Sequence, residues 1–253
     1  MINKFWKLAR KNFFFLFLSF QLRKWQSKFI SLILGKYVSS VLVESKGYKF
    51  LVHPGDMAVG RTLINKGVYS DKELSIIKNL VDNKSTVIFI GCHIGSLSIP
   101  IAKHVSKIYM IEANPFTYDL LEKNIKLNNI NNSILIETAA SDENGETEFL
   151  QNIVNSGGSK IKPKKLKYNY IYDSPRATTV KKSRIDDLID EPEVSLIFTD
   201  IEGSEYFALK GMQNLLSKCK VLIIEFLPDH LKNVSGVSVQ EFVKQLSSHF
   251  DNL

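Results

Sequence analysis

Cysteine, glycine and proline are all scarce in this chain of 253 residues, which contains 2 Cys, 13 Gly and 7 Pro. Two cysteines, Cys92 and Cys219, cannot build a disulfide scaffold, and so little glycine and proline excludes a collagen-like repeat. Hydrophobic residues make up 44% of the chain, which excludes a disordered protein. The composition therefore predicts a globular protein with one main core and reduced cysteines, of the kind found in the cytoplasm.

The N-terminal region lacks both acidic residues and an apolar run long enough to span a membrane. Residues 1–43 contain eight Lys or Arg and no Asp or Glu, and the longest apolar stretch, 13–20, has eight residues. A membrane-spanning helix needs about 20 apolar residues. Charged residues flank the stretch and no small-residue cleavage site follows it, which argues against a signal peptide.

Residues 1–37, which are rich in basic and aromatic residues and contain no acid, are therefore predicted to form an N-terminal arm outside the main domain. On a helical wheel, Lys4, Lys7, Arg10 and Lys11 fall on one side and apolar residues fall largely on the other. This pattern is typical of a helix that lies in the interface of an anionic membrane, so we expect residues 1–30 to contact the inner face of the membrane peripherally. The alternative is that the aromatic residues pack on the domain or on a second subunit of a homo-oligomer.

Residues 38–253 show the alternation of short apolar strands and helices that predicts an α/β domain. Two β-rich runs at 38–44 and 48–53 predict a hairpin, and Ser70 with Glu73 matches a helix-capping pattern. The elements predicted after them are strands at 86–90, 108–112, 134–138, 196–200 and 221–226 and helices at 98–104, 115–127 and 205–216. This order predicts a doubly wound, mostly parallel sheet with helices on both faces, whose ligands bind beyond the carboxyl ends of the strands.

Two glycines and an acid follow the first two of these parallel strands. Gly91 can adopt backbone angles that are closed to other residues, and Gly95 lets the start of the next helix approach a ligand. Glu112 lies 21 residues after Gly91, where a carboxylate can accept both hydroxyls of a ribose. The glycine order differs from the Gly-x-Gly-x-x-Gly order that holds a pyrophosphate, which favours a single nucleoside-like ligand over a dinucleotide.

Two further polar residues have two interpretations each. Asn114 either caps the helix that begins at Pro115 or touches the ligand. Asp142 either contacts an exocyclic amine of a base or is an ordinary turn residue before Asn144 and Gly145.

The segment 199–205 holds the densest group of carboxylates in the chain. Asp200 ends an apolar strand and faces the crevice, so it can hold a substrate hydroxyl or, if its pKa is raised, accept the hydroxyl proton. Glu202 and Glu205 lie three residues apart, so one can orient a substrate while the other stabilises the N-terminus of the next helix. Glu225 ends the last strand and adds an acid at the edge of the same pocket.

An ordered series of motifs between about residues 48 and 228 resembles one known family. The motifs are Gly91–Gly95, Ile111–Pro115, Ala139–Asp142, Asn155–Ser159, Arg184–Leu188 and Thr199–Glu205, followed by Leu209–Gly211. In this order they resemble the FkbM-type family of S-adenosylmethionine-dependent methyltransferases. That family has the class I Rossmann-like fold and mostly methylates hydroxyls of sugars and other natural products.

The resemblance implies that the cofactor is S-adenosylmethionine and that the reaction is O-methylation of a hydroxyl on a sugar, glycan or similar small-molecule acceptor. The cofactor-binding residues that it implies are Gly91, His93, Gly95, Glu112, Asn114 and Asp142. The active-centre residues that it implies are Asp200, Glu202 and Glu205. No metal is expected, because the five histidines show no pairing typical of metal ligands.

Three departures from the family pattern bear on these expectations. Phe89 stands where the family usually has an acid, two residues before the first glycine, which predicts a weaker hold on the amino-acid end of the cofactor. His93 replaces the usual Asn of the glycine loop, and its role stays open. Only 27 residues follow Phe226, too few for a helix and the usual closing hairpin, so we expect the C-terminal hairpin to be missing and the sheet edge to be covered differently.

A second basic region, residues 151–184, contains nine Lys or Arg, a single acid and three tyrosines, Tyr168, Tyr170 and Tyr172. It lies between two predicted strands, where an insertion overhangs the pocket, so we expect a lid that holds a phosphorylated or otherwise anionic glycan. A solvated loop is the alternative. Two separate basic regions on an acidic body predict two local contacts with anions, and no nucleic-acid partner.

Two other classes of function stay open at this point. A degenerate, non-catalytic member that acts as a membrane-associated binding protein agrees with Phe89 and with the short C-terminal segment. A nucleotide-dependent oxidoreductase is disfavoured by the glycine order.

Overall fold

The computed structural model describes residues 2–252, with side chains from residue 15 onward. Five parallel strands form the central sheet, in which each strand pairs in register with the next. Across the sheet they are β11 (Cys219–Ile224), β10 (Val194–Thr199), β3 (Thr86–Ile90), β4 (Lys107–Glu112) and β5 (Ser133–Glu137). The strand order reverses between β3 and β10, which is where ligands bind in doubly wound sheets. The predicted fold class is confirmed.

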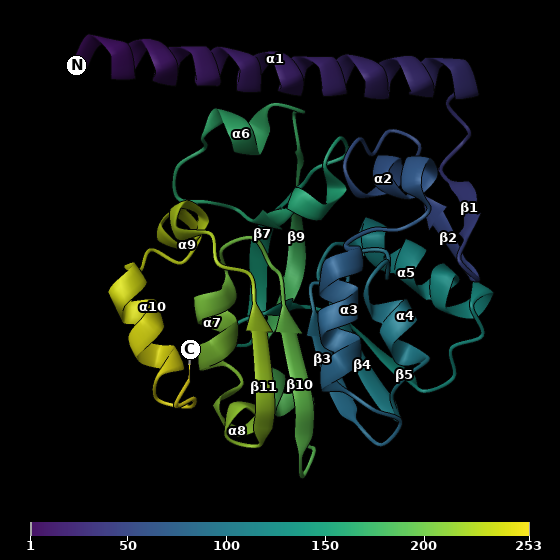
Figure 1. Ribbon diagram of the computed structural model, residues 1–253, viewed down its shortest axis with the longest axis vertical. Helices are drawn as coiled ribbons and strands as arrows, with labels where there is room; N and C mark the ends of the chain where they lie inside the picture. The colour runs from purple at the N-terminus through teal and green to yellow at the C-terminus, as the bar shows by residue number, and fades with distance from the viewer. Residues whose placement is uncertain (1, 253) are drawn as a thin grey trace.

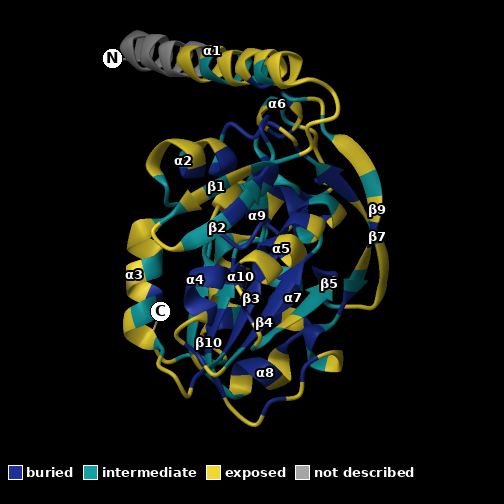
Figure 2. Ribbon diagram, turned by 90° about the vertical axis from the view of Figure 1, so that its right-hand side faces the viewer, coloured by how far each residue is buried: buried dark blue, intermediate teal, exposed yellow. Residues whose placement is uncertain are grey.

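Helices cover both faces of this sheet, because successive residues of a buried strand point to opposite sides. Val87, Phe89 and Met110 face one side and pack with α3 (Asp71–Leu80), α4 (Ser98–Ala102) and α5 (Pro115–Leu127). Ile88 and Ile90 face the other side and pack with α7 (Glu205–Lys210), α8 (Gln213–Ser217), α9 (Pro228–Val234) and α10 (Val239–Leu246). Figure 2 shows the strands buried between the two helical layers.

Two sequence predictions about helices need correction. The predicted helix 205–216 is divided into α7 and α8 at Gly211, where a Cβ would lie 1.8 Å from the backbone oxygen of Ser141. α3 begins after Ser70 as predicted, but Ser70 has φ +56° and its side chain makes no capping hydrogen bond. The start of the helix was therefore predicted correctly, but the capping hydrogen bond on which the prediction relied is not formed.

A second sheet of four short strands contains part of the basic region. Its order is β6 (Ala139–Ala140), β9 (Arg176–Ser183), β7 (Gly145–Gln151) and β8 (Lys160–Ile161). β9 runs antiparallel to β7 from Arg176 to Lys182, and a short helix, α6 (Tyr168–Ile171), lies between β8 and β9. Sequence periodicity missed this sheet, because polar and charged residues occupy most of its strands.

The N-terminal elements lie along the carboxyl edge of the central sheet (Figure 1). The hairpin of β1 (Val41–Ser45) and β2 (Tyr48–Val52) forms as predicted, and α2 (Val59–Lys66) follows it. α1 (Ile2–Leu34) is one long helix that crosses above α6. No helix in the part of the chain that the structure describes combines the length and hydropathy needed to cross a bilayer.

The C-terminal segment folds as two helices. After β11 the described chain continues through α9 and α10, and residues 225–252 add no strand to the central sheet. Phe242 of α10 is buried and stacks on Phe226 with ring centroids 5.7 Å apart. The family usually has a closing hairpin in this part of the chain, and we expected it to be missing here. The structure has the helices α9 and α10 in its place.

Candidate active site

A cavity of about 510 Å³ opens at the carboxyl ends of β3, β4, β10 and β11. Its size is in the range of about 300–1,000 Å³ that is usual for small-molecule sites. Residues from every predicted site segment line it, among them Gly91, His93, Glu112, Ala139, Asp200, Glu202 and Glu225. The cavity therefore lies where the strand order predicts a ligand.

The turn after β3 is built around Gly91. Its φ of +87° belongs to the left-handed region, and a Cβ would lie 1.9 Å from the backbone oxygen of Asp200. Only glycine lets the ends of β3 and β10 approach so closely. Gly95 has a different role from the one predicted: it does not line the cavity, and a Cβ there would collide with Ile99 and Leu121 of the core.

Glu112 ends β4 with its carboxylate at the cavity wall. Oε2 accepts the backbone N–H of His93 at 2.7 Å, and Oε1 accepts the backbone N–H of Asn114 at 2.8 Å. Burial raises the pKa of Glu112, although these hydrogen bonds oppose the rise. The side chain thus ties the glycine loop to the start of α5 and still faces the cavity.

His93 belongs to a buried polar chain that the sequence did not predict. The Ser156 hydroxyl donates to Oδ2 of Asp56 at 2.7 Å and lies 2.7 Å from Nε2 of His93. Because the hydroxyl proton points to Asp56, this network assigns the His93 proton to Nε2. Burial lowers the pKa of His93, against the raising effect of Asp56, so the ring is neutral at pH 7.

Two predicted cofactor ligands have structural contacts outside the cavity. Asn114 caps α5 by accepting the N–H of Phe116 at 3.1 Å, and it also accepts a hydrogen bond from Gln151 at 2.6 Å. Asp142 forms an ion pair with Lys210 at 3.0 Å. Neither side chain is among the lining residues, whereas the backbone segment 138–140 before Asp142 is.

Asp200 and Glu225 form a carboxyl pair in the cavity. The register of β10 and β11 places them side by side, since Glu225 N donates to Thr199 O at 2.8 Å and Asp200 N donates to Ile90 O at 3.0 Å. Burial, together with the charge of Glu202, raises the pKa of Asp200 to about 6. Burial and the charge of Asp200 raise the pKa of Glu225 to about 9. One carboxyl group of the pair is therefore protonated at pH 7 and the other is ionised.

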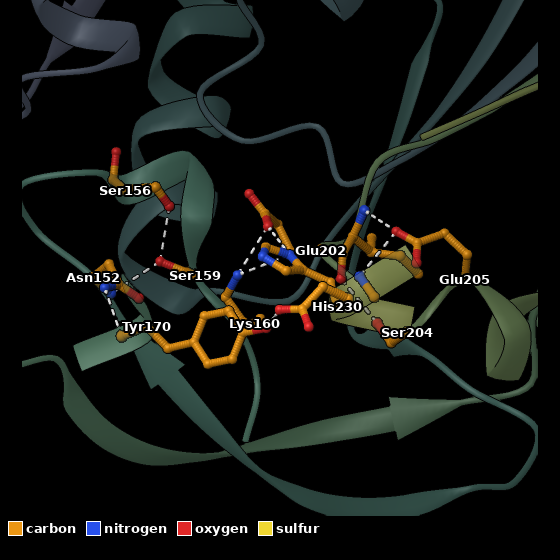
Figure 3. Close-up of polar contacts among 12 residues, drawn as sticks. Asn152, Ser156, Ser159, Lys160, Tyr170, Glu202, Ser204, Glu205 and His230 are labelled. Carbon is orange, nitrogen blue, oxygen red and sulfur yellow. Dashed lines mark hydrogen bonds and ion pairs between the residues drawn. The ribbon is translucent and has the colours of Figure 1, made fainter. Parts of the chain in front are cut away.

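Glu202 points to a buried cation and a histidine (Figure 3). Its Oε2 accepts from Lys160 Nζ at 2.8 Å and lies 2.8 Å from His230 Nδ1. Burial raises the pKa of Glu202, but the hydrogen bond from His230 and the charge of Lys160 outweigh it, so the pKa lies below its ordinary value. The Lys160 side chain is 4% exposed and also lies 4.9 Å above the Tyr170 ring.

Glu205 supports the loop and does not line the cavity. Its Oε1 accepts the backbone N–H groups of Ile201 at 3.1 Å and Gly203 at 3.2 Å (Figure 3). Burial raises the pKa of Glu205 to about 7. Of the two alternatives for this pair of acids, Glu205 holds the turn before α7, and Glu202 is the one that reaches the cavity.

Sequence reasoning missed Lys160, His230, Ser156 and Asp56 as site residues. Lys160 was counted among the nine bases of a lid, and nothing local marks it as the one that is buried. His230 lies beyond the last strand and reaches Glu202 only through the packing of α9. Phe89, which stands where the family usually has an acid, stacks on Phe198 in the core and does not line the cavity.

The architecture is that of a doubly wound α/β protein with a cavity at the switch in strand order. Residues 90–249 match the family model of the methyltransferase FkbM domain, which is more than half of the chain. The chain therefore belongs to the FkbM methyltransferase family, as its motifs predicted, and S-adenosylmethionine is the methyl donor of that family.

Comparisons with known proteins give shorter or weaker matches. An uncharacterised protein of Methanocaldococcus jannaschii is 42% identical over 77 residues, which are 29% of this chain and 30% of that protein. A putative protein N5-glutamine methyltransferase of the same organism is 37% identical over 95 residues, 36% of this chain and 42% of that protein. The match thus spans less than half the length of either relative. The methyltransferase FkbM from Methylobacillus flagellatus KT gives a TM-score of 0.47 at 18% identity, covering 68% of this chain and 39% of that one.

The cavity fits S-adenosylmethionine by the chemistry of its wall. Glu112 lines the cavity at the end of β4, a position from which a carboxylate can accept hydrogen bonds from ribose hydroxyls. Ala113, Ala139 and Ala140 provide a small apolar surface beside it for a flat base. The residues that would hold the cofactor are therefore Glu112, the turn at Gly91, His93 and the segment 138–140.

Proposed function

We propose that this methyltransferase acts on a hydroxyl oxygen, with Asp200 as the group that accepts the hydroxyl proton. The observation that carries the proposal is the Asp200–Glu225 pair. The Asp200 carboxylate, with a pKa of about 6, lies in the cavity beside the Glu225 carboxyl group, whose pKa of about 9 keeps it protonated at pH 7. A base with a pKa near the working pH is well suited to this proton transfer.

The chain needs to supply little else. Bound S-adenosylmethionine supplies a methyl group that is already activated on a sulfonium. The tasks of the protein are to hold the acceptor oxygen in line with that methyl group, to exclude water and to take the proton. Asp200 takes the proton, the protonated Glu225 lies beside it without adding a second charge, and the Lys160–Glu202–His230 cluster holds Glu202 in the neighbouring wall of the cavity.

A sugar or glycan that carries negative charge is the acceptor class we propose. Part of the basic region borders the cavity, since Ser156, Gly157, Ser159 and Ile161 line it. Lys164 and Lys165 follow on the surface of the same segment and are exposed. These exposed lysines belong to the segment that borders the cavity and can meet an anionic group on an extended acceptor without a desolvation cost.

Labelled methyl donor tests this proposal directly. Extract fractions are incubated with the protein and S-adenosylmethionine labelled on the methyl group, and products heavier by one labelled methyl group are sought by mass spectrometry. The proposal expects an O-methylated, anionic glycan that is absent with Asp200→Asn and present with Asp190→Asn, a control at a 93% exposed acid. Label on an amide nitrogen, the chemistry in the name of one relative, would contradict it.

A further inference from the structure

The helix α1 has two different faces, and one of them packs on the domain. Phe20 stacks on Tyr172 with centroids 4.4 Å apart, Lys24 Nζ donates to the backbone oxygen of Tyr172 at 3.1 Å, and Ser27 is buried. Gln21 donates to the Tyr168 hydroxyl at 2.6 Å. These contacts fix the orientation of the helix and determine which face points away from the domain.

The opposite face is apolar and exposed. Its residues recur at steps of three and four, which places them on one side of a helix. They are Leu18 (42% exposed), Leu22 (54%), Trp25 (70%), Phe29 (63%), Leu32 (79%) and Ile33 (65%). Figure 2 shows most of the described part of α1 as exposed, in contrast to the buried strands below it. A continuous apolar stripe of this kind on a surface marks an interaction site.

The charge around this stripe selects its partner. Residues 1–43 carry eight bases and no acid, and Arg23 and Lys28 are exposed on α1. Two copies of the helix would bring only positive charges together, which disfavours self-association. An anionic surface gains from the exposed bases of this region, among them Arg23 and Lys28.

We propose that α1 binds an anionic lipid bilayer through this outward face and lies parallel to the membrane surface. Trp25 and Phe29, near the middle of the stripe, enter the boundary between headgroups and acyl chains, where aromatic side chains are favoured. The flanking bases contact the anionic headgroups. The sequence predicted a membrane contact through residues 1–30. The contact proposed from the structure instead uses the exposed face from Leu18 to Ile33. The side chains before residue 15, on which the earlier helical wheel relied, lie outside the described residues.

This arrangement brings the cavity wall formed by residues 155–157 close to the bilayer. Tyr172, which stacks on Phe20, packs with Val154 in one small cluster, and the next residues, Asn155 to Gly157, line the cavity. One layer of side chains therefore separates α1 from the cavity wall. In Figure 1 α1 lies above the carboxyl ends of the strands.

Vesicle flotation tests the membrane proposal without any need for methyl transfer. The full chain is mixed with vesicles of phosphatidylcholine alone, or of phosphatidylcholine with phosphatidylserine, and centrifuged through a density gradient. We expect flotation with the anionic vesicles, weakened by salt, and a loss of about tenfold or more in binding for the double variant Trp25→Ser with Phe29→Ser. The control is Ile76→Ser on α3, which changes an exposed apolar residue (55%) outside α1 and leaves binding unchanged.

Fluorescence gives a second readout. In a Trp6→Phe background Trp25 is the single tryptophan of the chain, and its emission shifts to the blue on contact with anionic vesicles. Failure of the wild-type chain to float with anionic vesicles overturns the proposal. Equal losses in the double variant and in the control overturn it as well. A wild-type dimer in solution that the double variant dissociates assigns the stripe to a second copy and also contradicts the proposal.

Discussion

Replacing Asp200 by Asn removes the proposed base while keeping the size of the side chain. Asp200 lies at the end of β10, where its backbone N–H donates to the backbone oxygen of Ile90 at 3.0 Å. Asparagine cannot accept a proton at neutral pH, so the acceptor hydroxyl has to lose its proton to water. A positioned general base contributes about 10²–10⁴-fold to the rate. We expect kcat to fall by at least about 100-fold in this variant, with the affinity for S-adenosylmethionine nearly unchanged.

The pKa of Asp200 also sets a pH dependence. At a pKa of about 6, roughly nine-tenths of this carboxyl group is ionised at pH 7 and roughly one-tenth at pH 5. The base works in the ionised form, so activity is lost as the pH falls through 6. We expect kcat/KM to drop about tenfold between pH 7 and pH 5.

The assay is methyl transfer to the acceptor identified by mass spectrometry, measured from pH 5 to pH 8. Glu225→Gln is the matched variant, because Glu225 is protonated and uncharged at neutral pH and glutamine keeps its size without a charge. This variant should keep most of its turnover and its acid limb. If Asp200→Asn keeps a turnover within a factor of three of wild type, Asp200 is not the base. The same conclusion follows if Glu225→Gln no longer shows the fall in kcat/KM between pH 7 and pH 5.

Three further predictions concern stability. Gly91→Ala places a Cβ 1.9 Å from the Asp200 backbone oxygen at φ +87°, so urea unfolding should show a loss of more than about 3 kcal/mol, and calorimetry no cofactor binding. Lys160→Met leaves the carboxylate of Glu202 with His230 as its one charged partner among these three residues, so the free energy of unfolding in urea should fall by about 3 kcal/mol. The double variant Lys160→Met with Glu202→Gln should recover part of that loss. No recovery would refute the pairing of Lys160 with Glu202. Glu225 has a raised pKa in the folded state, so the native protein binds more protons than the unfolded chain and wild-type stability falls as the pH rises toward 9. Thermal melting of Glu225→Gln should therefore show a gain in Tm over wild type that is larger at pH 8 than at pH 5, and an equal gain at both would contradict the raised pKa.

The central sheet was predictable because its strands are short, apolar and bounded by glycine or polar residues. The strand 86–90 and the helix 115–127 were predicted with the bounds that the structure shows, since hydrophobic period and capping by Asn114 agree there. The second sheet was not predicted. Its strands β7 and β9 consist mostly of charged and polar residues and find partners only through long-range pairing, which no local pattern encodes.

The site was predictable only where it follows the strand ends. Gly91, Glu112, Asp200 and Glu202 reach the cavity because parallel strands deliver their last residues to one edge. Gly95 and Asn114 match the same motifs yet serve packing and capping, a distinction that depends on which neighbours surround them in space. Lys160 and His230 come from separate segments, so their meeting at Glu202 was beyond any spacing argument. The sequence placed Glu225 at the edge of the same pocket, but the raised pKa values of Asp200 and Glu225 depend on their burial in the folded chain.

Calorimetric titration with S-adenosylmethionine tests the central claim most directly. The claim is that the cavity holds this cofactor with Glu112 at its ribose. We predict saturable binding to the folded wild-type chain and a loss of about tenfold or more for Glu112→Gln, since a carboxylate that accepts two hydroxyl hydrogen bonds contributes at least about 1.4 kcal/mol. Glu137→Gln, at the exposed end of the adjacent strand, should bind like wild type. A folded wild-type chain that takes up another nucleotide and gives no heat with S-adenosylmethionine would contradict the account.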